Sequence, residues 1–162
     1  MSGVAEPAAH VARVRALLDD VFDPEIPVLT IGDLGVLRAV EVEDGATVVT
    51  VTPTYSGCPA MDAIRADIAV VLHRAGVTDF EIRTAYAPAW TTDWMGEAAK
   101  TKLAEFGIAP PARVAEAMVA PVRCPRCRST ATTTISEFGS TACKALVVCD
   151  ACREPFDLFK AI

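Results

Sequence analysis

Four cysteines in two closely spaced pairs impose the strongest constraint on the fold of this chain. Cys124 and Cys127 form the first pair, Cys149 and Cys152 form the second, and residues 128–148 lie between them. A spacer of two residues lets one tight turn direct both thiolates at a single ion, and two such turns complete a tetrahedral shell. We therefore expect these four cysteines to bind one metal ion, with zinc as the first choice and iron or an iron–sulfur cluster as the alternative.

The residues around these cysteines are predicted to form a small zinc-ribbon-like domain, a metal-bound β-ribbon over residues 113–162. Two stretches between the pairs are typical of strands, residues 131–138 and 143–148. A unit of this size buries too little apolar surface to be stable alone. A structural zinc ion contributes roughly 10–16 kcal/mol of apparent binding free energy. The alternative is four cysteines without a metal, acting as redox-active pairs.

A fifth cysteine lies in the same segment and leaves two interpretations open. Cys143 comes six residues before Cys149 in the second predicted strand. It is either an alternative ligand to the metal or a small apolar residue of the strand.

The acidic composition excludes some classes of partner. The chain has 15 basic and 21 acidic residues, a net charge of −6, whereas binding to a phosphate backbone requires a concentrated basic surface. We therefore expect no nucleic-acid partner. We also expect no membrane segment, because no apolar run reaches spanning length, and no secretory signal. The expected location is the cytoplasm, where six cysteines indicate metal binding or reactive thiols rather than disulfides.

The apolar periodicity upstream predicts a compact α+β domain over residues 1–112, with the order helix, strand, strand, helix, strand, helix. Asp44-Gly45 is typical of a type I′ turn that joins the two strands of a hairpin. An irregular acidic segment, residues 23–35, precedes the hairpin, and a proline-rich linker is expected at residues 109–121. The predicted helices cover about residues 10–22, 59–75 and 92–106, and the predicted strands cover 36–43, 46–54 and 80–82.

Cys58 is the candidate reactive residue of the first domain. It directly precedes Pro59, and proline favours the first position of a helix, so Cys58 is expected to be the N-cap. Free backbone N–H groups and the positive end of the helix dipole would lower the pKa of its thiol. Such a thiolate can ligate iron or act as a nucleophile. A buried structural cysteine fits the local sequence equally well.

The sequence lacks the motifs of a self-sufficient enzyme. It has no GxGxxG motif and no P-loop. Neither of its two histidines, His10 and His73, follows a glutamate by three residues, so the Glu-x-x-His element of di-iron oxygenases is absent. We expect both histidines at the surface, and no histidine is placed to activate Cys58 as a nucleophile. The chain is therefore expected not to be catalytic by itself.

Two stretches of the first domain resemble a known family. DPEIPVLTIGDLGVL and VTVTPTYSGCPAMDAI are similar to the metal–sulfur cluster biosynthesis domain of iron–sulfur assembly factors. The resemblance implies that Cys58 is a transient metal or cluster ligand and that Asp23 and Glu25 support it. Asp33 of the same acidic motif is expected to be structural. Trp90 and Trp94 are expected in the core, with a partner-facing surface as the alternative.

Taken with the segment AWTTDWM and the cysteine ribbon, almost the whole chain resembles PaaD. This family, also named PaaJ, comprises small D subunits associated with bacterial phenylacetyl-CoA epoxidase. The resemblance implies an accessory protein of aerobic phenylacetate degradation that helps mature or insert an iron or iron–sulfur centre. Its implied partners are the oxygenase or reductase subunits and the iron–sulfur assembly machinery. The alternative is an integral, non-catalytic subunit of the 1,2-epoxidase complex. The apolar content also allows a homodimer.

Overall fold

The computed structural model describes residues 5–162. The expectation of no secretory signal rests in part on residues 1–4, which lie outside this range. The chain divides into two compact units, one ending at Trp90 and the other comprising Thr91–Ile162. Each unit combines helical segments with one small sheet, which confirms the predicted α+β class. Across residues 5–162, no helix is both long enough and apolar enough to span a bilayer.

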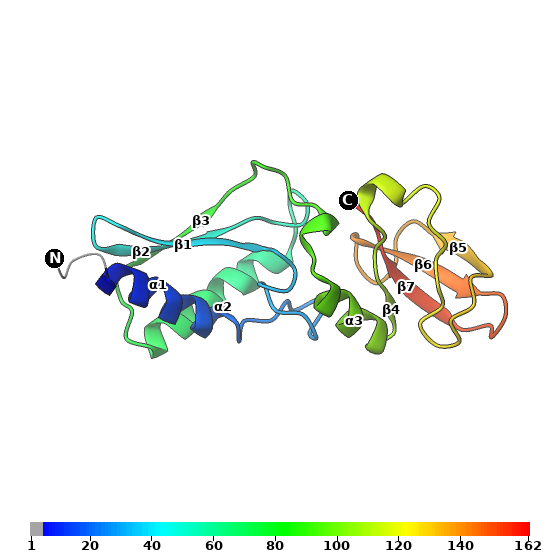
Figure 1. Cartoon of the computed structure of the whole chain (residues 1–162), viewed down its shortest axis with the longest axis horizontal. Coiled ribbons are helices and arrows are strands. Elements are labelled where there is room, and N and C mark those ends of the chain that lie inside the picture. The colour runs from blue at the N-terminus through cyan, green and yellow to red at the C-terminus, as the bar shows by residue number, and fades with distance from the viewer. Residues whose placement is uncertain (1–4) are drawn as a thin grey trace. The chain divides into compact units, whose positions relative to one another are not determined.

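The first unit is a three-stranded sheet with two helices. Its central strand β2 pairs antiparallel with β1 and parallel with β3. Figure 1 shows α1 and α2 side by side along one face of this sheet. The elements are α1 (Ala5–Leu18), β1 (Leu37–Glu43), β2 (Ala46–Val51), α2 (Ala60–Arg74) and β3 (Phe80–Thr84).

The hairpin between β1 and β2 has the predicted turn. Asp44 and Gly45 both have a positive φ, 50° and 89°, which is the requirement of a type I′ turn. Val40 is buried, whereas Val42 is 37% exposed and lies next to the turn, where it pairs with Thr47.

The core of this unit lies between the helices and the sheet. Apolar side chains at helical spacing on α2 pack in it, since Ile64, Ile68 and Leu72 are all almost fully buried. The other buried members include Val14 and Leu18 of α1 and Val40, Val48, Val49 and Val51 of the sheet.

The first helix ends four residues earlier than the sequence predicts, at Leu18 instead of Phe22. The chain turns back after Leu18 because residues 21–23 pair with residues 29–31. The N–H of Asp23 donates to the carbonyl of Leu29 at 2.9 Å, and the N–H of Ile31 donates to the carbonyl of Val21 at 2.9 Å. Tertiary pairing therefore overrides a helical pattern that continues in the sequence.

The second unit is a four-stranded sheet in the order β4-β7-β6-β5, preceded by one α-helix. Strands β5, β6 and β7 pair antiparallel as a ribbon, and β4 adds in parallel beside β7. The elements are η1 (Thr92–Trp94), α3 (Glu97–Glu105), β4 (Ile108–Ala109), η2 (Val114–Glu116), β5 (Thr132–Ser136), β6 (Lys144–Cys149) and β7 (Pro155–Phe159).

The last predicted helix, residues 92–106, is interrupted in the structure. Met95 and Gly96 have extended backbones, with ψ of 120° and 164°, so a 3₁₀ turn precedes the α-helix. Gly107 follows the helix with φ of 91°, the conformation expected of the glycine after a helix end.

The division into units lies after Trp90, about 20 residues before the boundary that the sequence suggests. The segment expected to be a linker begins inside the second sheet, because Ile108 and Ala109 pair with Asp157 and Leu158 of β7. A two-residue strand has no periodicity that a sequence could reveal.

Candidate metal centre and the Cys58 pocket

The structure brings the four paired cysteines together. The Sγ atoms of Cys124, Cys127, Cys149 and Cys152 all lie within 4.8 Å of one another. Across the two pairs, Sγ of Cys124 lies 3.7 Å from Sγ of Cys152, and Sγ of Cys127 lies 3.5 Å from Sγ of Cys149. In a tetrahedron with metal–sulfur bonds of about 2.3 Å, the sulfurs are about 3.8 Å apart. The four thiols therefore fit one tetrahedral ion.

Each pair lies on a turn held by its own backbone. The N–H of Cys124 donates to the carbonyl of Ser129, and the N–H of Cys149 donates to the carbonyl of Glu154, both at 2.9 Å. These bonds close each turn, so that both thiols of a pair point to the same side. The ribbon strands β5 and β6 then bring the second turn to the first.

The surroundings of Cys149 lower the pKa of its thiol. The backbone N–H of Cys152 donates to its Sγ at 3.5 Å. This bond, with smaller contributions from the Cys127 thiol and the N–H of Ala151, lowers the pKa of Cys149 to about 7, although burial raises it. When a thiol has a pKa near neutral, removal of its proton costs little free energy as a metal binds.

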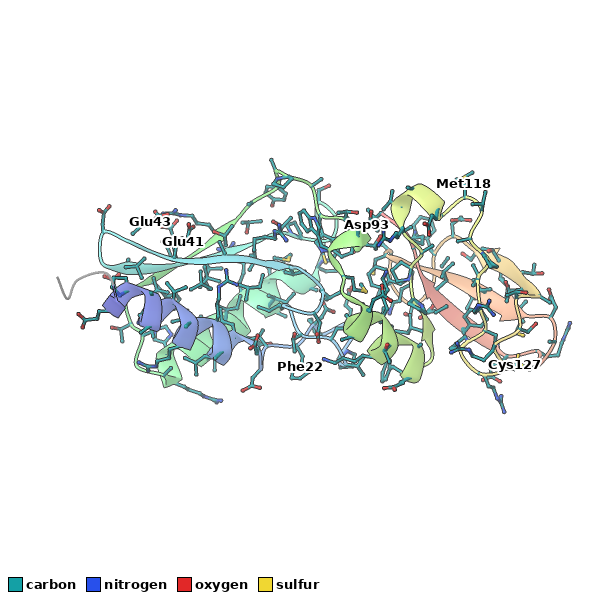
Figure 2. All side chains as sticks on the ribbon, viewed as in Figure 1. Phe22, Glu41, Glu43, Asp93, Met118 and Cys127 are labelled. Carbon is teal, nitrogen blue, oxygen red and sulfur yellow. The ribbon has the colours of Figure 1, made fainter. Side chains whose placement is uncertain are left out.

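The centre has a buried side and an exposed side. Cys124 and Cys149 are fully buried and pack with Val147, Phe156 and Ala109 in the core of the ribbon. Cys127, labelled in Figure 2, is exposed. Four thiolates complete the coordination of a tetrahedral ion and leave no open position, which is the arrangement of structural sites rather than catalytic ones.

Cys143 does not belong to this group. It directly precedes β6, whereas Cys149 is the last residue of that strand. At about 3.3 Å per residue, six residues of strand separate the two cysteines by about 20 Å. Cys143 is buried, and its Sγ lies 3.0 Å from the hydroxyl of Thr141. The placement fits the structural interpretation and not the role of an alternative ligand.

Cys58 lies one residue further from α2 than predicted. Pro59 is the N-cap residue and already has helical dihedral angles, φ −69° and ψ −21°, with no side-chain capping bond. The carbonyl of Cys58 accepts a bond from the N–H of Met61 at 3.3 Å, and its own N–H donates to the carbonyl of Tyr55 at 3.2 Å. Cys58 therefore ends a tight turn that leads into the helix.

The pKa of the Cys58 thiol is raised, contrary to the prediction. Burial is the main cause, and the negative charges of Glu25 and Asp23 raise the pKa further. Hydrogen bonds from the N–H of Ala60 and the hydroxyl of Thr54 oppose this effect but do not outweigh it. The sequence pattern shows the start of the helix but not the partial burial of Cys58 or the two nearby carboxylates. The expected direction of the pKa shift is therefore wrong.

The acidic segment before the hairpin holds Asp23 and Glu25 in electrostatic range of Cys58. Asp23 is buried, and its Oδ1 accepts bonds from the N–H groups of Glu25 at 2.8 Å and Ile26 at 2.9 Å. Asp33 and Thr30 bond each other's backbone N–H with their side chains, both at 3.0 Å. This reciprocal pair gives Asp33 a structural role, whereas Asp23 both orders the turn and acts on the thiol.

A pocket of about 350 Å³ opens beside Cys58. Its walls come from the first two turns of α2 and from the segment before this helix. The last residue of β3, Thr84, and the nearby Tyr86 complete them. The sequence pattern does not single out the polar members of this wall, although Arg65 lies four residues after Met61 and so on the same face of α2. The lining residues are Pro53, Gly57, Cys58, Pro59, Met61, Asp62, Arg65, Thr84 and Tyr86.

The histidines and tryptophans take no part in either site. Nε2 of His10 lies 2.8 Å from the hydroxyl of Thr47 and is partly buried. His73 is exposed as expected and stacks edge-on against Phe80. Trp90 is buried, and its Nε1 donates to the carbonyl of Leu34 at 2.9 Å, whereas Trp94 is only partly buried.

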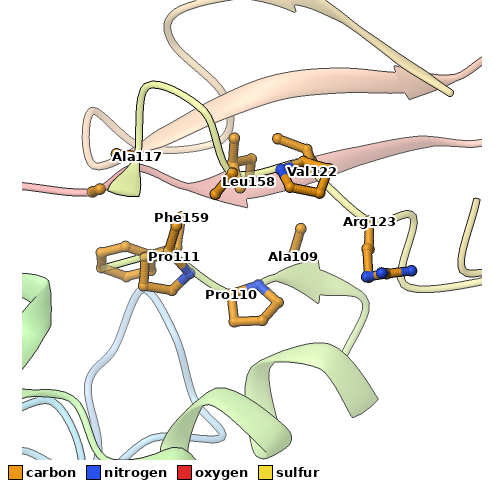
Figure 3. A pocket seen from close by; sticks show the side chains of 12 residues that line it. Ala109, Pro110, Pro111, Ala117, Val122, Arg123, Leu158 and Phe159 are labelled. Carbon is orange, nitrogen blue, oxygen red and sulfur yellow. The ribbon is translucent and has the colours of Figure 1, made fainter. Parts of the chain in front are cut away.

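The second unit has an apolar surface of its own. Prolines, alanines and the side chains of Val122, Leu158 and Phe159 line a hollow of about 210 Å³ (Figure 3). Met118 and Val119, in the segment after η2, are 95% and 84% exposed, and Figure 2 shows Met118 projecting outward. From the sequence, this segment is expected to be part of the proline-rich linker.

Two family profiles match the chain, one in each unit. The profile of an iron–sulfur cluster assembly protein matches residues 11–84, which include Asp23, Glu25 and Cys58. The profile of the PaaD zinc beta ribbon domain matches residues 109–160, which include all four cysteines of the metal centre.

Individual relatives agree with the profiles. A protein of Escherichia coli (strain K12) that is named as the D subunit of 1,2-phenylacetyl-CoA epoxidase is 51% identical over all of this chain and 98% of its own length. An Fe-S protein maturation auxiliary factor of Porphyromonas gingivalis (strain ATCC BAA-308 / W83) is 39% identical over 54% of this chain and 84% of its own length. A crystal structure of a DUF59 domain from Bacillus anthracis has a TM-score of 0.57 and 29% identity, over 62% of this chain and 97% of that domain.

Proposed function

The chain belongs to the PaaD family of epoxidase D subunits, and on this basis we propose that it is an accessory protein that helps mature an iron or iron–sulfur centre in the phenylacetyl-CoA epoxidase system. The client would be one of the oxygenase or reductase subunits. The iron is cargo in this proposal, and Cys58 is its transient ligand. Relatives named as Fe-S protein maturation factors match about half of the chain, which supports maturation over a purely structural role.

The observation that carries the proposal is the surroundings of Cys58. Its thiol is only partly buried, lies on the wall of a pocket, and has the carboxylates of Asp23 and Glu25 in electrostatic range. A site that offers both a soft sulfur ligand and hard carboxylate oxygens is better suited to iron than to a hard ion such as Mg²⁺ or a soft ion such as Cu⁺. The raised pKa keeps the thiol protonated near neutral pH, so a cation must displace the proton to bind, and the return of the proton favours release of the cation.

For the ribbon we propose a structural zinc ion held by Cys124, Cys127, Cys149 and Cys152. The sulfurs lie within 4.8 Å of one another, which leaves room for one ion and none for the bridging sulfides of a cluster. The ribbon has only a small apolar core, so zinc would supply the free energy that keeps it folded.

We further propose that the ribbon unit docks onto the client protein. The exposed side chains of Met118 and Val119 and the apolar hollow of Figure 3 support this part. The alternative function is an integral, non-catalytic component of the 1,2-epoxidase, which the 51% identity to a named D subunit supports. Full activity of a purified, preassembled epoxidase that lacks this chain would favour maturation, and loss of activity on its removal would favour the integral component.

The central test is complementation of a deletion strain growing on phenylacetate. Cys58→Ser removes a soft ligand but keeps nearly the same size, so it should abolish growth without lowering the melting temperature. Cys143→Ser is the matched control, since the same chemical change is made outside both sites, and it should restore growth. Normal growth with a folded Cys58→Ser variant would show that Cys58 is structural and that the proposal is wrong.

A further inference from the structure

Arg65 occupies an unusual position in the acidic first unit. It is half-buried on the wall of the Cys58 pocket, and its Nη1 donates to the hydroxyl of Thr84 at 2.7 Å. Among residues 5–162, no carboxylate lies within ion-pair distance of its guanidinium. Arg83 of β3, the residue before Thr84, in contrast forms ion pairs with both Glu43 and Glu81. A guanidinium has five N–H donors, so most of those of Arg65 remain for a ligand in the pocket.

The pocket has two chemically different ends. Met61, Asp62 and Arg65 lie on one face of α2 at helical spacing, and Cys58 lies in the turn that leads into the helix, so the thiol and the guanidinium belong to different parts of the pocket wall. The volume of about 350 Å³ is that of a small-ligand site. Thr84 holds the guanidinium at its end, and Tyr86 completes the wall.

The charges fix how an acidic ligand would lie. Asp23 and Glu25 act on the thiol of Cys58 and would repel a carboxylate placed next to it. Arg65 is the one cationic side chain among the residues that line the pocket, so a carboxylate is stabilised at that end. A guanidinium binds carboxylate through two parallel hydrogen bonds, which also fixes its orientation.

We propose that this pocket binds an acidic thiol, with its sulfur at Cys58 and its carboxylate on Arg65. This deepens the proposed function, because a second thiol beside Cys58 would be the natural donor or acceptor of the iron cargo. The same chemistry can come from a soluble acidic thiol peptide or from a cysteine in an acidic segment of a client protein.

The test compares two disulfides that differ only in carboxylate charge, glutathione disulfide and its ethyl ester. The Cys58 thiolate attacks one sulfur, a mixed disulfide forms, and one glutathione thiolate leaves. The rate is followed at Cys58 alone, by mass spectrometry of the peptide that contains it, in the full-length metal-bound chain. The readout is the rate with glutathione disulfide divided by the rate with its ethyl ester. The fraction of Cys58 present as thiolate is the same in both reactions and therefore cancels in this ratio.

Arg65→Gln should lower this ratio about 10-fold, the effect of one charge-assisted bidentate contact. Arg65→Lys should retain part of it. Asp62→Asn, which removes a negative charge from the same wall, should raise the ratio. Arg74→Gln is the matched control, because it removes the same charge from the last turn of α2, outside the pocket. A ratio that falls no further in Arg65→Gln than in Arg74→Gln, with both variants folded, would overturn the proposal.

A second arm identifies the source of the thiol. Mixed disulfides of two cysteine peptides, one with glutamates and one with glutamines around the cysteine, replace the glutathione pair. If the rate ratio depends on Arg65 for the glutathione pair alone, the site binds a soluble thiol. If the ratio for the peptide pair depends on Arg65, the site binds a segment of a client protein. No dependence in either arm rejects the site. Because the readout needs no iron and no growth, it is separate from the complementation test of Cys58.

Discussion

Arg128 and Arg153 occupy the same position in the two cysteine turns of the metal centre. The N–H of Arg128 donates to the carbonyl of Cys124, and the N–H of Arg153 donates to the carbonyl of Cys149, both at 2.9 Å. Both arginines are in the left-handed region, with φ of 68° and 65°. The two turns are thus copies of one conformation, and each contains a residue whose Cβ is strained there.

Arg153→Gly should therefore stabilise the ribbon. Glycine adopts positive φ without the steric cost to other residues, so we expect a gain of up to about 1 kcal/mol in the free energy of unfolding. Arg153→Ala removes the same charge but keeps a Cβ, so it should bring no such gain. The measurement is thermal and chelator-induced unfolding of the three proteins at one metal concentration. Equal stabilisation by alanine would assign the effect to charge instead of backbone strain.

The metal centre makes a stoichiometric prediction. Purified protein should contain about one tightly bound metal ion per chain, and Cys124→Ser or Cys149→Ser should lose it, because a serine hydroxyl replaces a buried thiolate ligand. The ribbon should then unfold, while the first unit, which has its own core, should keep its melting transition. Elemental analysis and site-resolved hydrogen exchange measure the two effects. A folded ribbon without metal would contradict this expectation.

The environment of Cys58 predicts a pH dependence. Since burial and the carboxylates raise the pKa of its thiol above the ordinary 9.0, alkylation by neutral iodoacetamide should have its midpoint above that of a free thiol. A thiol whose pKa is raised on folding stabilises the protein below its unfolded pKa. This contribution disappears as the pH rises through the folded pKa.

Glu25→Gln should move the alkylation midpoint of Cys58 towards lower pH, because it removes one of the two charges that oppose the thiolate. Glu41→Gln, an exposed carboxylate of β1 that does not act on Cys58, is the control and should leave the midpoint unchanged. The profile is recorded by mass spectrometry of the Cys58 peptide. A midpoint that stays in place in Glu25→Gln would mean that this carboxylate does not act on the thiol.

A side chain at Gly139 should destabilise the ribbon. A Cβ at this position would lie 2.3 Å from Oδ1 of Asp157 and 3.2 Å from the backbone of Ala145. Asp157 also accepts bonds from the N–H and hydroxyl of Ser140, so Gly139→Ala must displace this contact and should cost about 1–3 kcal/mol. At Gly32 a Cβ makes only ordinary contacts, and Gly32→Ala should be nearly neutral in denaturant titrations. Similar costs at both positions would argue against the close approach of Asp157.

The exposed apolar segment of the ribbon unit predicts the behaviour of the docking surface. Met118→Asp should weaken co-purification with the oxygenase or reductase subunits, because it places a charge where an apolar contact is proposed. It should leave metal content and melting temperature unchanged, since Met118 is 95% exposed. Ala115→Asp, on the neighbouring 3₁₀ turn, controls for the added charge. Undiminished association of Met118→Asp would remove this surface from the proposal.

The features that depend on local chemistry could be predicted from the order of the residues. The spacing within each cysteine pair predicts a turn that directs two thiols to one ion, and such a turn needs no information from the rest of the chain. Asp44-Gly45 likewise predicts its own positive φ values, and the spacing of Ile64, Ile68 and Leu72 predicts the buried face of α2. These are short-range rules of backbone and periodicity.

The properties that depend on distant segments required the folded chain. The pairing of residues 21–23 with 29–31 ends α1 early, and β7 turns part of an expected linker into β4. The pKa of Cys58 is raised because burial and the carboxylates of a segment more than 30 residues away outweigh the helix start. Charge and burial act through space, so a local pattern gives the position of the thiol but not the sign of its pKa shift.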